Sequence, residues 1–138
     1  MSIDVFEKPS VTVDAVVISW DWRILLVRRK NNPYKGFWAL PGGFVNEGEE
    51  PKDAVLRELQ EETNLTNATV QKIVGVYGGQ GRDSRGWIIS IGYRILPHPG
   101  HMSQIVAQDD AVEVDWFLLD DLPILAFDHN SIVIDALN

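Results

Sequence analysis

The 138-residue chain contains no cysteine, which excludes disulfide bonds, thiolate metal ligands and cysteine nucleophiles. Positive charge is also scarce: 12 lysines and arginines stand against 20 aspartates and glutamates, for a formal net charge of -8. Because nucleic acids are polyanions whose binding needs a basic face, we expect no nucleic-acid partner. A small anionic ligand would need a compensating positive group, and a bound metal ion is the obvious candidate.

Long apolar runs are missing as well. No segment approaches the roughly 20 apolar residues that a membrane-spanning helix needs. The first ten residues, MSIDVFEKPS, lack the apolar core of a secretion signal. We therefore expect a cytoplasmic protein without a membrane partner. Hydrophobic residues make up 45 % and charged residues 23 %, which is typical of a globular chain, and the length suits one domain spanning residues 1–138.

Strand patterns outnumber helical ones. β-branched and apolar residues predict strands at 11–20, 24–29, 37–45, 67–78 and 87–96, and a strand followed by a turn at 112–123. The first two strands flank a short turn and are expected to form a hairpin. One helix is predicted from Pro51 to about Thr63 and a second over 129–137, while 79–86 and 97–104 are expected to be loops. The fold class is α+β or α/β, with a mixed sheet covered by helices.

The segment RELQEETNL, residues 57–65, carries three glutamates within five positions. At about 100° per residue, Glu58, Glu61 and Glu62 share one arc of the helix while Leu59 faces the core. Their repulsion and their place near the negative end of the helix dipole each cost a few tenths of a kcal/mol. A divalent cation such as Mg²⁺ would remove both costs.

The alternative for this segment is a solvated acidic helix face. The sequence just before it, LPGGFVNEGEE, favours a ligand site, because a glycine turn lets the backbone approach a ligand closely.

The spacing of residues 43–65 resembles the Nudix box, the 23-residue signature of the Nudix hydrolase superfamily. The matching positions are Gly43, Glu49, Arg57-Glu58-Leu59, Glu61-Glu62 and Leu65. Asn64 departs from the family, which has glycine there, but asparagine is the commonest substitute in the left-handed conformation past a helix end. The flanking KGFWALPGGFV and the strand order extend the resemblance over nearly the whole chain. It implies the Nudix fold, a mixed β-sheet between helices (α/β/α).

The resemblance implies a hydrolase that cleaves the pyrophosphate of a nucleoside diphosphate linked to another moiety, with Mg²⁺ or Mn²⁺ as cofactor. By position, the metal ligands would be Glu58, Glu61, Glu62 and the carbonyl of Gly43. Arg57 would hold an acidic side chain in place, and Glu58 or Glu61 could help to deprotonate water. Gly42, Glu49 and Asn64 would have structural roles in the motif.

The catalytic base has a second possible source outside the box. In some branches of the family a carboxylate from another loop serves, and the turn AQDDAVEVDW offers Asp109, Asp110 and Glu113. Asp110 is the candidate that we select. The alternative for each of the three is an ordinary solvated carboxylate.

Three segments resemble the bacterial ADP-ribose pyrophosphatase branch: TVDAVV, GRDSRGWIISIGY and LAFDHNSIVIDAL. Ser84 stands where that branch usually has proline. Within the second segment, Arg82 and Arg85 are candidates for contacting phosphate or ribose. Arg28, at a strand end beside the box, is a further candidate for phosphate, and Trp38 is a candidate for stacking on a base. The alternatives are solvated loop arginines, a structural ion pair and core packing, respectively.

Three functions compete. The leading one is hydrolysis of ADP-ribose to AMP and ribose 5-phosphate. The second is a house-cleaning hydrolase that converts nucleoside triphosphates to monophosphates and pyrophosphate. The third is a non-catalytic sensor of NAD metabolites, a group whose boxes often lose their glutamates, whereas these are intact. Many relatives are homodimers, so a homodimer is expected.

Overall fold

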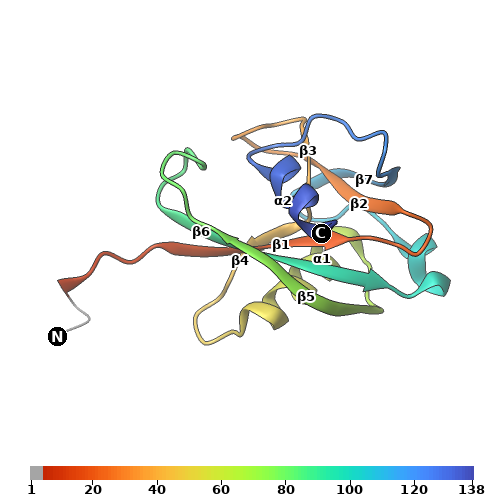
Figure 1. Cartoon of the computed structure of the whole chain (residues 1–138), viewed down its shortest axis with the longest axis horizontal. Coiled ribbons are helices and arrows are strands. Elements are labelled where there is room, and N and C mark those ends of the chain that lie inside the picture. The colour runs from red at the N-terminus through yellow and green to blue at the C-terminus, as the bar shows by residue number, and fades with distance from the viewer. Residues whose placement is uncertain (1–4) are drawn as a thin grey trace.

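The computed structural model describes residues 5–138 (Figure 1). The elements follow the order β1 (Ser10–Val17), β2 (Arg23–Arg29), β3 (Trp38–Ala39), β4 (Gly42–Phe44), α1 (Pro51–Thr63), β5 (Ala68–Tyr77), β6 (Ile88–Pro97), the 3-10 helix η2 (Pro99–Gln104), β7 (Ala111–Leu118) and α2 (His129–Ala136). Most predicted elements are present, but 99–104 is a 3-10 helix where a loop was expected. Neither α1 nor α2 has the length and apolarity needed to cross a membrane, and the same holds for every helix within 5–138.

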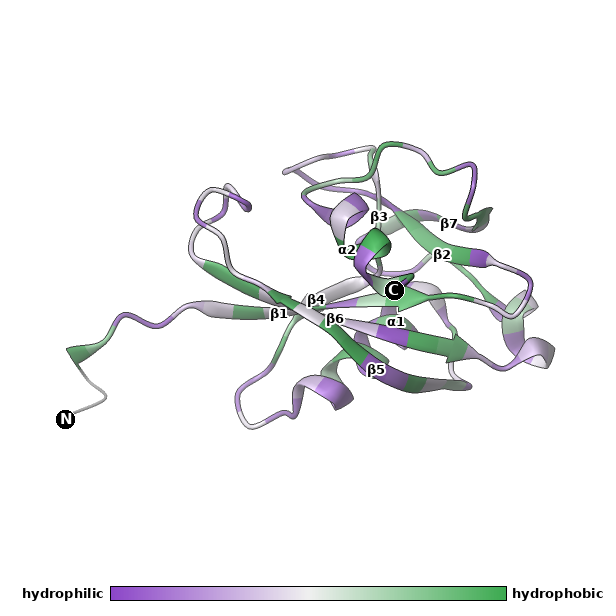
Figure 2. Ribbon diagram, viewed as in Figure 1, coloured by the Kyte–Doolittle hydropathy of each residue, from purple (hydrophilic) through white to green (hydrophobic). Residues whose placement is uncertain are grey.

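The strands form two sheets. The larger has the order β4-β1-β6-β5, in which β1 runs parallel to β6 and the other pairs are antiparallel. The smaller is antiparallel, in the order β3-β2-β7, and β2 is apolar along most of its length (Figure 2). Residues alternate between the two faces of a strand, and β1 uses both faces. Val13 and Val17 pack in the same cluster as α1, whereas Val16 and Ile18 pack with α2. The predicted mixed sheet between helices is confirmed.

The predicted hairpin of the first two strands is wrong. β1 and β2 lie in different sheets, and the turn between them keeps one isolated bridge, between Ile18 and Ile24. Both edges of β1 are already occupied, by β4 and β6, so no edge is left for β2.

The predicted strand at 37–45 is divided. β3 and β4 belong to different sheets and are separated by Leu40 and Pro41. Proline has no N–H to donate to a sheet, so the chain leaves the small sheet there. The glycines of β4 therefore lie beside β1, directly facing the helix α1.

Candidate active site

Helix α1 presents its three box glutamates to different surroundings. Val55 and Leu59 anchor the helix in the core. Glu62 is only 8 % exposed, and the side chain of Glu58 is 14 % exposed. Glu61, whose side chain is 45 % exposed, stays at the rim. The structure therefore brings two of the three predicted ligands into one cavity and leaves the third beside it.

The cavity has a volume of about 360 Å³. Polar and glycine residues dominate its lining: Arg29, Asn31, Asn32, Gly42, Gly43, Asn46, Glu58, Glu62, Arg85 and Asp110, with Phe44. The candidate base Asp110 thus lies in the same cavity as Glu58 and Glu62. The other two candidate bases, Asp109 and Glu113, do not line the cavity, and Glu113 pairs with Arg28 instead.

Burial raises the pKa of both inward carboxylates. The pKa of Glu62 rises from 4.5 to about 8, first because the group is buried and second because Glu58 carries the same charge. Burial also raises the pKa of Glu58, against the opposing effect of Arg57. Gly42 N donates to Glu62 Oε2 over 3.3 Å, which compensates only part of the cost. Such a pair is costly when ionised unless a cation joins it.

Arg57 connects the glycine turn to the helix. Its Nε and Nη2 donate to the two carboxylate oxygens of Glu49, over 2.7 and 3.0 Å. Its Nη1 donates to Glu58 over 2.9 Å and to Glu61 over 3.1 Å, and Nη2 also donates to the carbonyl of Phe44. The bidentate pairing lowers the pKa of Glu49 to about 2. Arg57 and Glu49 therefore hold the glycine turn against the glutamates of α1.

The donor chemistry of the cavity fits a hard cation. The acidic side chains of the lining, Glu58, Glu62 and Asp110, offer carboxylate oxygens, which suit Mg²⁺ or Mn²⁺ better than metals that prefer nitrogen or sulfur. Within residues 5–138, no three histidine, aspartate or glutamate side chains are already arranged as ligands. A cation held by two carboxylates and a backbone oxygen would complete its coordination with water and substrate phosphate.

The structure places Arg29, not Arg28, in the cavity. Arg28 pairs with Glu113 at 2.5 Å and lines neither this cavity nor the smaller pocket that adjoins it. Arg29 lines the cavity, donates from Nε to Pro33 O over 2.8 Å, and forms no ion pair within residues 5–138. Sequence reasoning missed Arg29. The alternation of β2 indicates that the two arginines face opposite ways, but only the pairing with β7 shows which one faces out.

Arg82 and Arg85 both lie at the site, each already paired with a carboxylate. Arg82 donates to Asp128 over 2.6 and 2.8 Å and to Ser90 over 3.0 Å. Arg85 donates to Asp83 over 2.7 and 3.0 Å, and its guanidinium stacks at 5.2 Å on the rings of both Phe44 and Phe127. The side chain of Arg82 is only 10 % exposed, whereas that of Arg85 is 35 % exposed, and a neighbouring carboxylate compensates the charge of each.

The other predicted residues lie further away. Trp38 packs edge-on against Phe117, with ring centroids 4.7 Å apart, and lines neither cavity. Asn64 follows α1 in the left-handed conformation, with φ of 64°, and its backbone N–H bonds to Gln60. Its side chain donates to Gln104 O. Asn64 thus occupies the conformation that was expected of the family's glycine.

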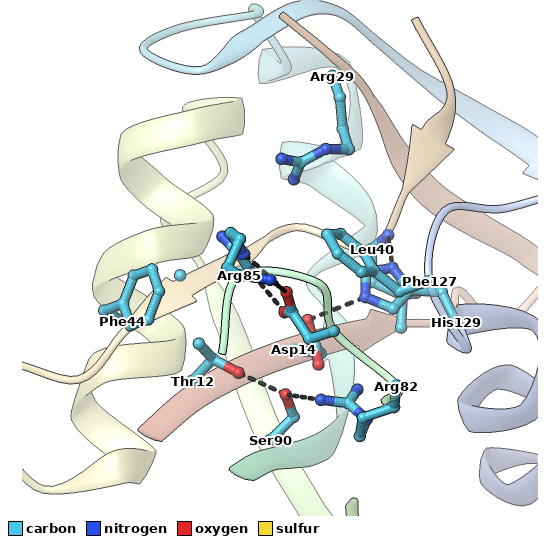
Figure 3. Close-up of a pocket in the computed structure, with 13 residues that line it drawn as sticks. Thr12, Asp14, Arg29, Leu40, Phe44, Arg82, Arg85, Ser90, Phe127 and His129 are labelled. Atoms are coloured by element: carbon cyan, nitrogen blue, oxygen red, sulfur yellow. Dashed lines mark hydrogen bonds and ion pairs between the residues drawn. The ribbon is translucent and has the colours of Figure 1, made fainter. Parts of the chain in front are cut away.

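A second, smaller pocket of about 50 Å³ adjoins the cavity, and its polar residues had not been selected from the sequence, apart from Arg82 and Arg85. Asp14, Thr12, Ser90, Asp83 and His129 line it (Figure 3). Asp14 and His129 lie in the segments TVDAVV and LAFDHNSIVIDAL, whose resemblance to the ADP-ribose pyrophosphatase branch did not single out either residue. A polar residue inside an apolar strand pattern is the sequence signal that could have singled out Asp14.

The NUDIX domain family matches residues 8–136 of this chain. The chain belongs to the Nudix family. An ADP-ribose pyrophosphatase of Methanocaldococcus jannaschii is 50 % identical over 127 residues, which are 92 % of this chain and 72 % of that protein. The ADPR responsive transcriptional repressor NtrR of Acinetobacter baylyi is 31 % identical, over 95 % of this chain and 54 % of the repressor.

Solved structures are similar over the same extent. The NUDIX domain of Shewanella oneidensis NrtR complexed with ADP ribose has a TM-score of 0.85 and 32 % identity, covering 99 % of this chain and 92 % of that one. The bifunctional NMN adenylyltransferase/ADP ribose pyrophosphatase of Francisella tularensis complexed with AMP and Mn ion has a TM-score of 0.78 and 33 % identity, covering 96 % of this chain and 42 % of that one. The Nudix fold is therefore confirmed.

Proposed function

We propose that the protein is a Mg²⁺-dependent pyrophosphohydrolase that cleaves ADP-ribose to AMP and ribose 5-phosphate, with Mn²⁺ as a possible replacement. One observation carries the proposal. The buried carboxylate of Glu62 and the partly buried one of Glu58, both with raised pKa values, share a cavity with Arg29, a cation without an ion pair in the described residues. Such a cavity suits a cation together with a diphosphate.

Each residue has a defined task in this reaction. Glu58, Glu62 and the carbonyl of Gly43 hold the cation, and Arg57 keeps Glu58 and the glycine turn in register. Arg29 binds the phosphate oxygens by charge. A bound Mg²⁺ would supply charge neutralisation and a more acidic water. Water forms a bond to one phosphorus while the bridging P–O bond breaks, and Asp110 or a box glutamate takes the proton from the water.

ADP-ribose is selected because the Methanocaldococcus relative is an ADP-ribose pyrophosphatase at 50 % identity and the Shewanella neighbour was solved with ADP ribose. The similarity to the NtrR repressor supports a second candidate, a sensor that binds ADP-ribose without cleaving it. The complete set of box carboxylates favours the enzyme, since a sensor has no need of the costly pair Glu58 and Glu62.

The test is a product analysis with ADP-ribose, NADH, dinucleoside polyphosphates and nucleoside triphosphates, each with Mg²⁺ or Mn²⁺. We expect AMP and ribose 5-phosphate from ADP-ribose, and loss of turnover in Glu62→Gln. Asp115→Asn, which changes an exposed carboxylate of β7, is the matched control. Tight ADP-ribose binding without turnover of any substrate would support the sensor. Release of pyrophosphate from triphosphates would support the house-cleaning hydrolase.

We also propose a cytoplasmic homodimer with neither a nucleic-acid nor a membrane partner. The exposed apolar side chains around the β1–β2 turn support an interface between copies: Trp20 is 72 % and Trp22 57 % exposed, and Leu118 and Leu137 are exposed near Trp22. Light scattering of Trp20→Ser/Trp22→Ser against the unchanged protein tests this, since a monomer in both cases would contradict it.

A further inference from the structure

The small pocket beside the cavity is narrow. Its volume is about 50 Å³, and about 10–15 Å³ suffices for one water-sized group, so it has room for a few such groups. The pocket and the cavity share Arg29, Gly42, Gly43, Phe44 and Arg85 in their linings. A molecule whose diphosphate lies in the cavity can therefore extend one small group into the pocket.

Nearly every polar side chain around the pocket already has a partner. Arg82 bonds to Asp128 and Ser90, and Arg85 bonds to Asp83. The hydroxyl groups of Thr12 and Ser90 bond to each other. Among the buried side-chain atoms of residues 5–138, only three lack a partner, and Asp14 Oδ2 is the one that belongs to this pocket.

The other oxygen of Asp14, Oδ1, faces His129 and Gly42. Asp14 lies on β1 between β4 and β6, is 6 % exposed, and is opposite Gly42 in the sheet. Its Oδ1 lies 3.4 Å from His129 Nε2 (Figure 3). A Cβ on Gly42 would clash first with the backbone oxygen of Val13 and would also lie 2.9 Å from Asp14 Oδ1, so glycine is needed at this position.

His129 contributes a fixed donor and no charge. Leu40 N donates to His129 Nδ1 over 3.0 Å, so the ring proton is on Nε2, next to Asp14 Oδ1. Burial lowers the pKa of His129 to about 3, so the ring is neutral near pH 7. The neutral imidazole therefore lies beside Asp14 Oδ1 without supplying a compensating charge, and Oδ2 has no partner within the described residues.

An unsatisfied buried acceptor costs about 1–3 kcal/mol, which a neutral donor of suitable size can recover. A sugar hydroxyl fits, because it projects from a tetrahedral carbon and enters alone. An exocyclic amine lies in the plane of its base, so ring atoms on both sides would have to enter with it.

We propose that Asp14 is a specificity-determining residue whose carboxylate accepts a hydrogen bond from one sugar hydroxyl of the substrate while the diphosphate occupies the adjoining cavity. His129 is its positioning residue. The assignment rests on the proposed function, because it needs a nucleoside diphosphate sugar in the cavity.

The experiment compares ADP-ribose with analogues that each lack one ribose hydroxyl, and with the inosine analogue that lacks the base amine. At pH 8.5, above the pKa of about 7 that burial gives Asp14, one deoxy analogue should lose roughly 10- to 100-fold in kcat/KM in the unchanged protein, the size expected for a hydrogen bond to a charged group. Asp14→Asn turns an amide donor toward the pocket. The Asp14→Asn variant should cleave ADP-ribose with about the kcat/KM that the unchanged protein has for the sensitive deoxy analogue. Its kcat/KM for the deoxy analogue itself should fall little further. If Asp14 had only a structural role, the substitution would lower kcat/KM equally for ADP-ribose and for the deoxy analogue.

Two variants serve as checks. Asp14→Ala removes the acceptor without adding a donor, and it replaces Asp14→Asn if that variant does not fold. It should likewise reduce the difference in kcat/KM between ADP-ribose and the sensitive deoxy analogue. Asp115→Asn should keep the unchanged profile.

The outcomes separate the two proposals. If the unchanged protein cleaves ADP-ribose but treats every deoxy analogue alike, or discriminates only the inosine analogue, the Asp14 assignment is overturned and the proposed function stands. If it cleaves no nucleoside diphosphate sugar, the proposed function fails and the assignment fails with it.

Discussion

Gly43 lies directly against the carboxyl group of Glu58, so that a Cβ at position 43 would be 2.5 Å from Glu58 Oε2. Glycine is therefore needed at position 43 because any larger side chain would displace the carboxyl group of Glu58. Gly43→Ala should move the Glu58 carboxylate and lower metal-dependent kcat/KM by about tenfold or more, since misplaced catalytic groups of this kind cost up to about 100-fold. Thermal unfolding should change little, because the end of a glutamate side chain can shift.

The control for this substitution is Gly79→Ala, where a Cβ meets nothing within 4 Å. It should leave both the steady-state constants and the unfolding temperature unchanged. An active Gly43→Ala protein with unchanged metal dependence would remove the link between the turn and Glu58.

The adjacent arginines of β2 form a matched pair of variants. Arg29→Ala removes the arginine of the cavity that has no ion pair within residues 5–138 and should raise the KM for ADP-ribose by roughly 10-fold or more, the effect of losing one charge-assisted hydrogen bond. Arg28→Ala breaks an ion pair with Glu113 in which both side chains are partly exposed, and such pairs contribute about 0–1 kcal/mol to stability. Steady-state kinetics should therefore separate the two. Equal effects on KM would contradict the assignment of Arg29.

The spacing of the box predicted the contacts that depend on one helix and the turn before it. Glu58, Glu62 and Arg57 lie on α1, so their relative positions follow from the helix repeat, and Gly43 lies close to them along the chain. The same spacing did not distinguish Glu61, because exposure depends on what packs on each side of the helix.

Contacts between distant strands could not be predicted in this way. The side of β2 that faces the cavity depends on its register with β7, and the separation of β1 from β2 depends on β4 and β6 taking both edges of β1. Trp38 illustrates the same limit, since it packs on Phe117, which is remote in sequence. The pocket around Asp14 combines β1, β6, the 79–86 loop and α2, and no local pattern brings these together.

Asn64 provides a test of the departure from the box. Its φ of 64° is in the left-handed region, where a residue with an ordinary side chain costs about 1–2 kcal/mol and glycine costs little. Asn64→Ala should therefore lower the free energy of unfolding in urea by about 1 kcal/mol or more. Asn64→Gly should stay within about 0.5 kcal/mol, as glycine relieves the backbone but loses the bond to Gln104. Both proteins should keep their kcat, and an Asn64→Ala protein as stable as the original would contradict the backbone argument.

Glu62 should make the metal-free protein less stable as the pH rises above neutrality. Its pKa is about 8 in the folded protein and near 4.5 when unfolded, so the folded state binds the extra proton between these values. Stability is complete below pH 4.5 and is lost as the pH rises through 8. Asp14, whose pKa burial raises to about 7, acts in the same direction. His129, with a lowered pKa of about 3, acts oppositely, but only below pH 6.5.

The effect of Glu62 is therefore best isolated by measuring the free energy of unfolding between pH 6.5 and pH 8.5 in the presence of a metal chelator. Over this range, the free energy of unfolding of the unchanged protein should fall by about 1–2 kcal/mol, since each pKa unit corresponds to about 1.4 kcal/mol. Glu62→Gln should lose most of this slope, because its amide does not ionise, and Asp115→Asn should keep it. Added Mg²⁺ should suppress the slope in the unchanged protein, because a cation compensates the ionised Glu62. A slope that is identical in Glu62→Gln would show that other groups cause it.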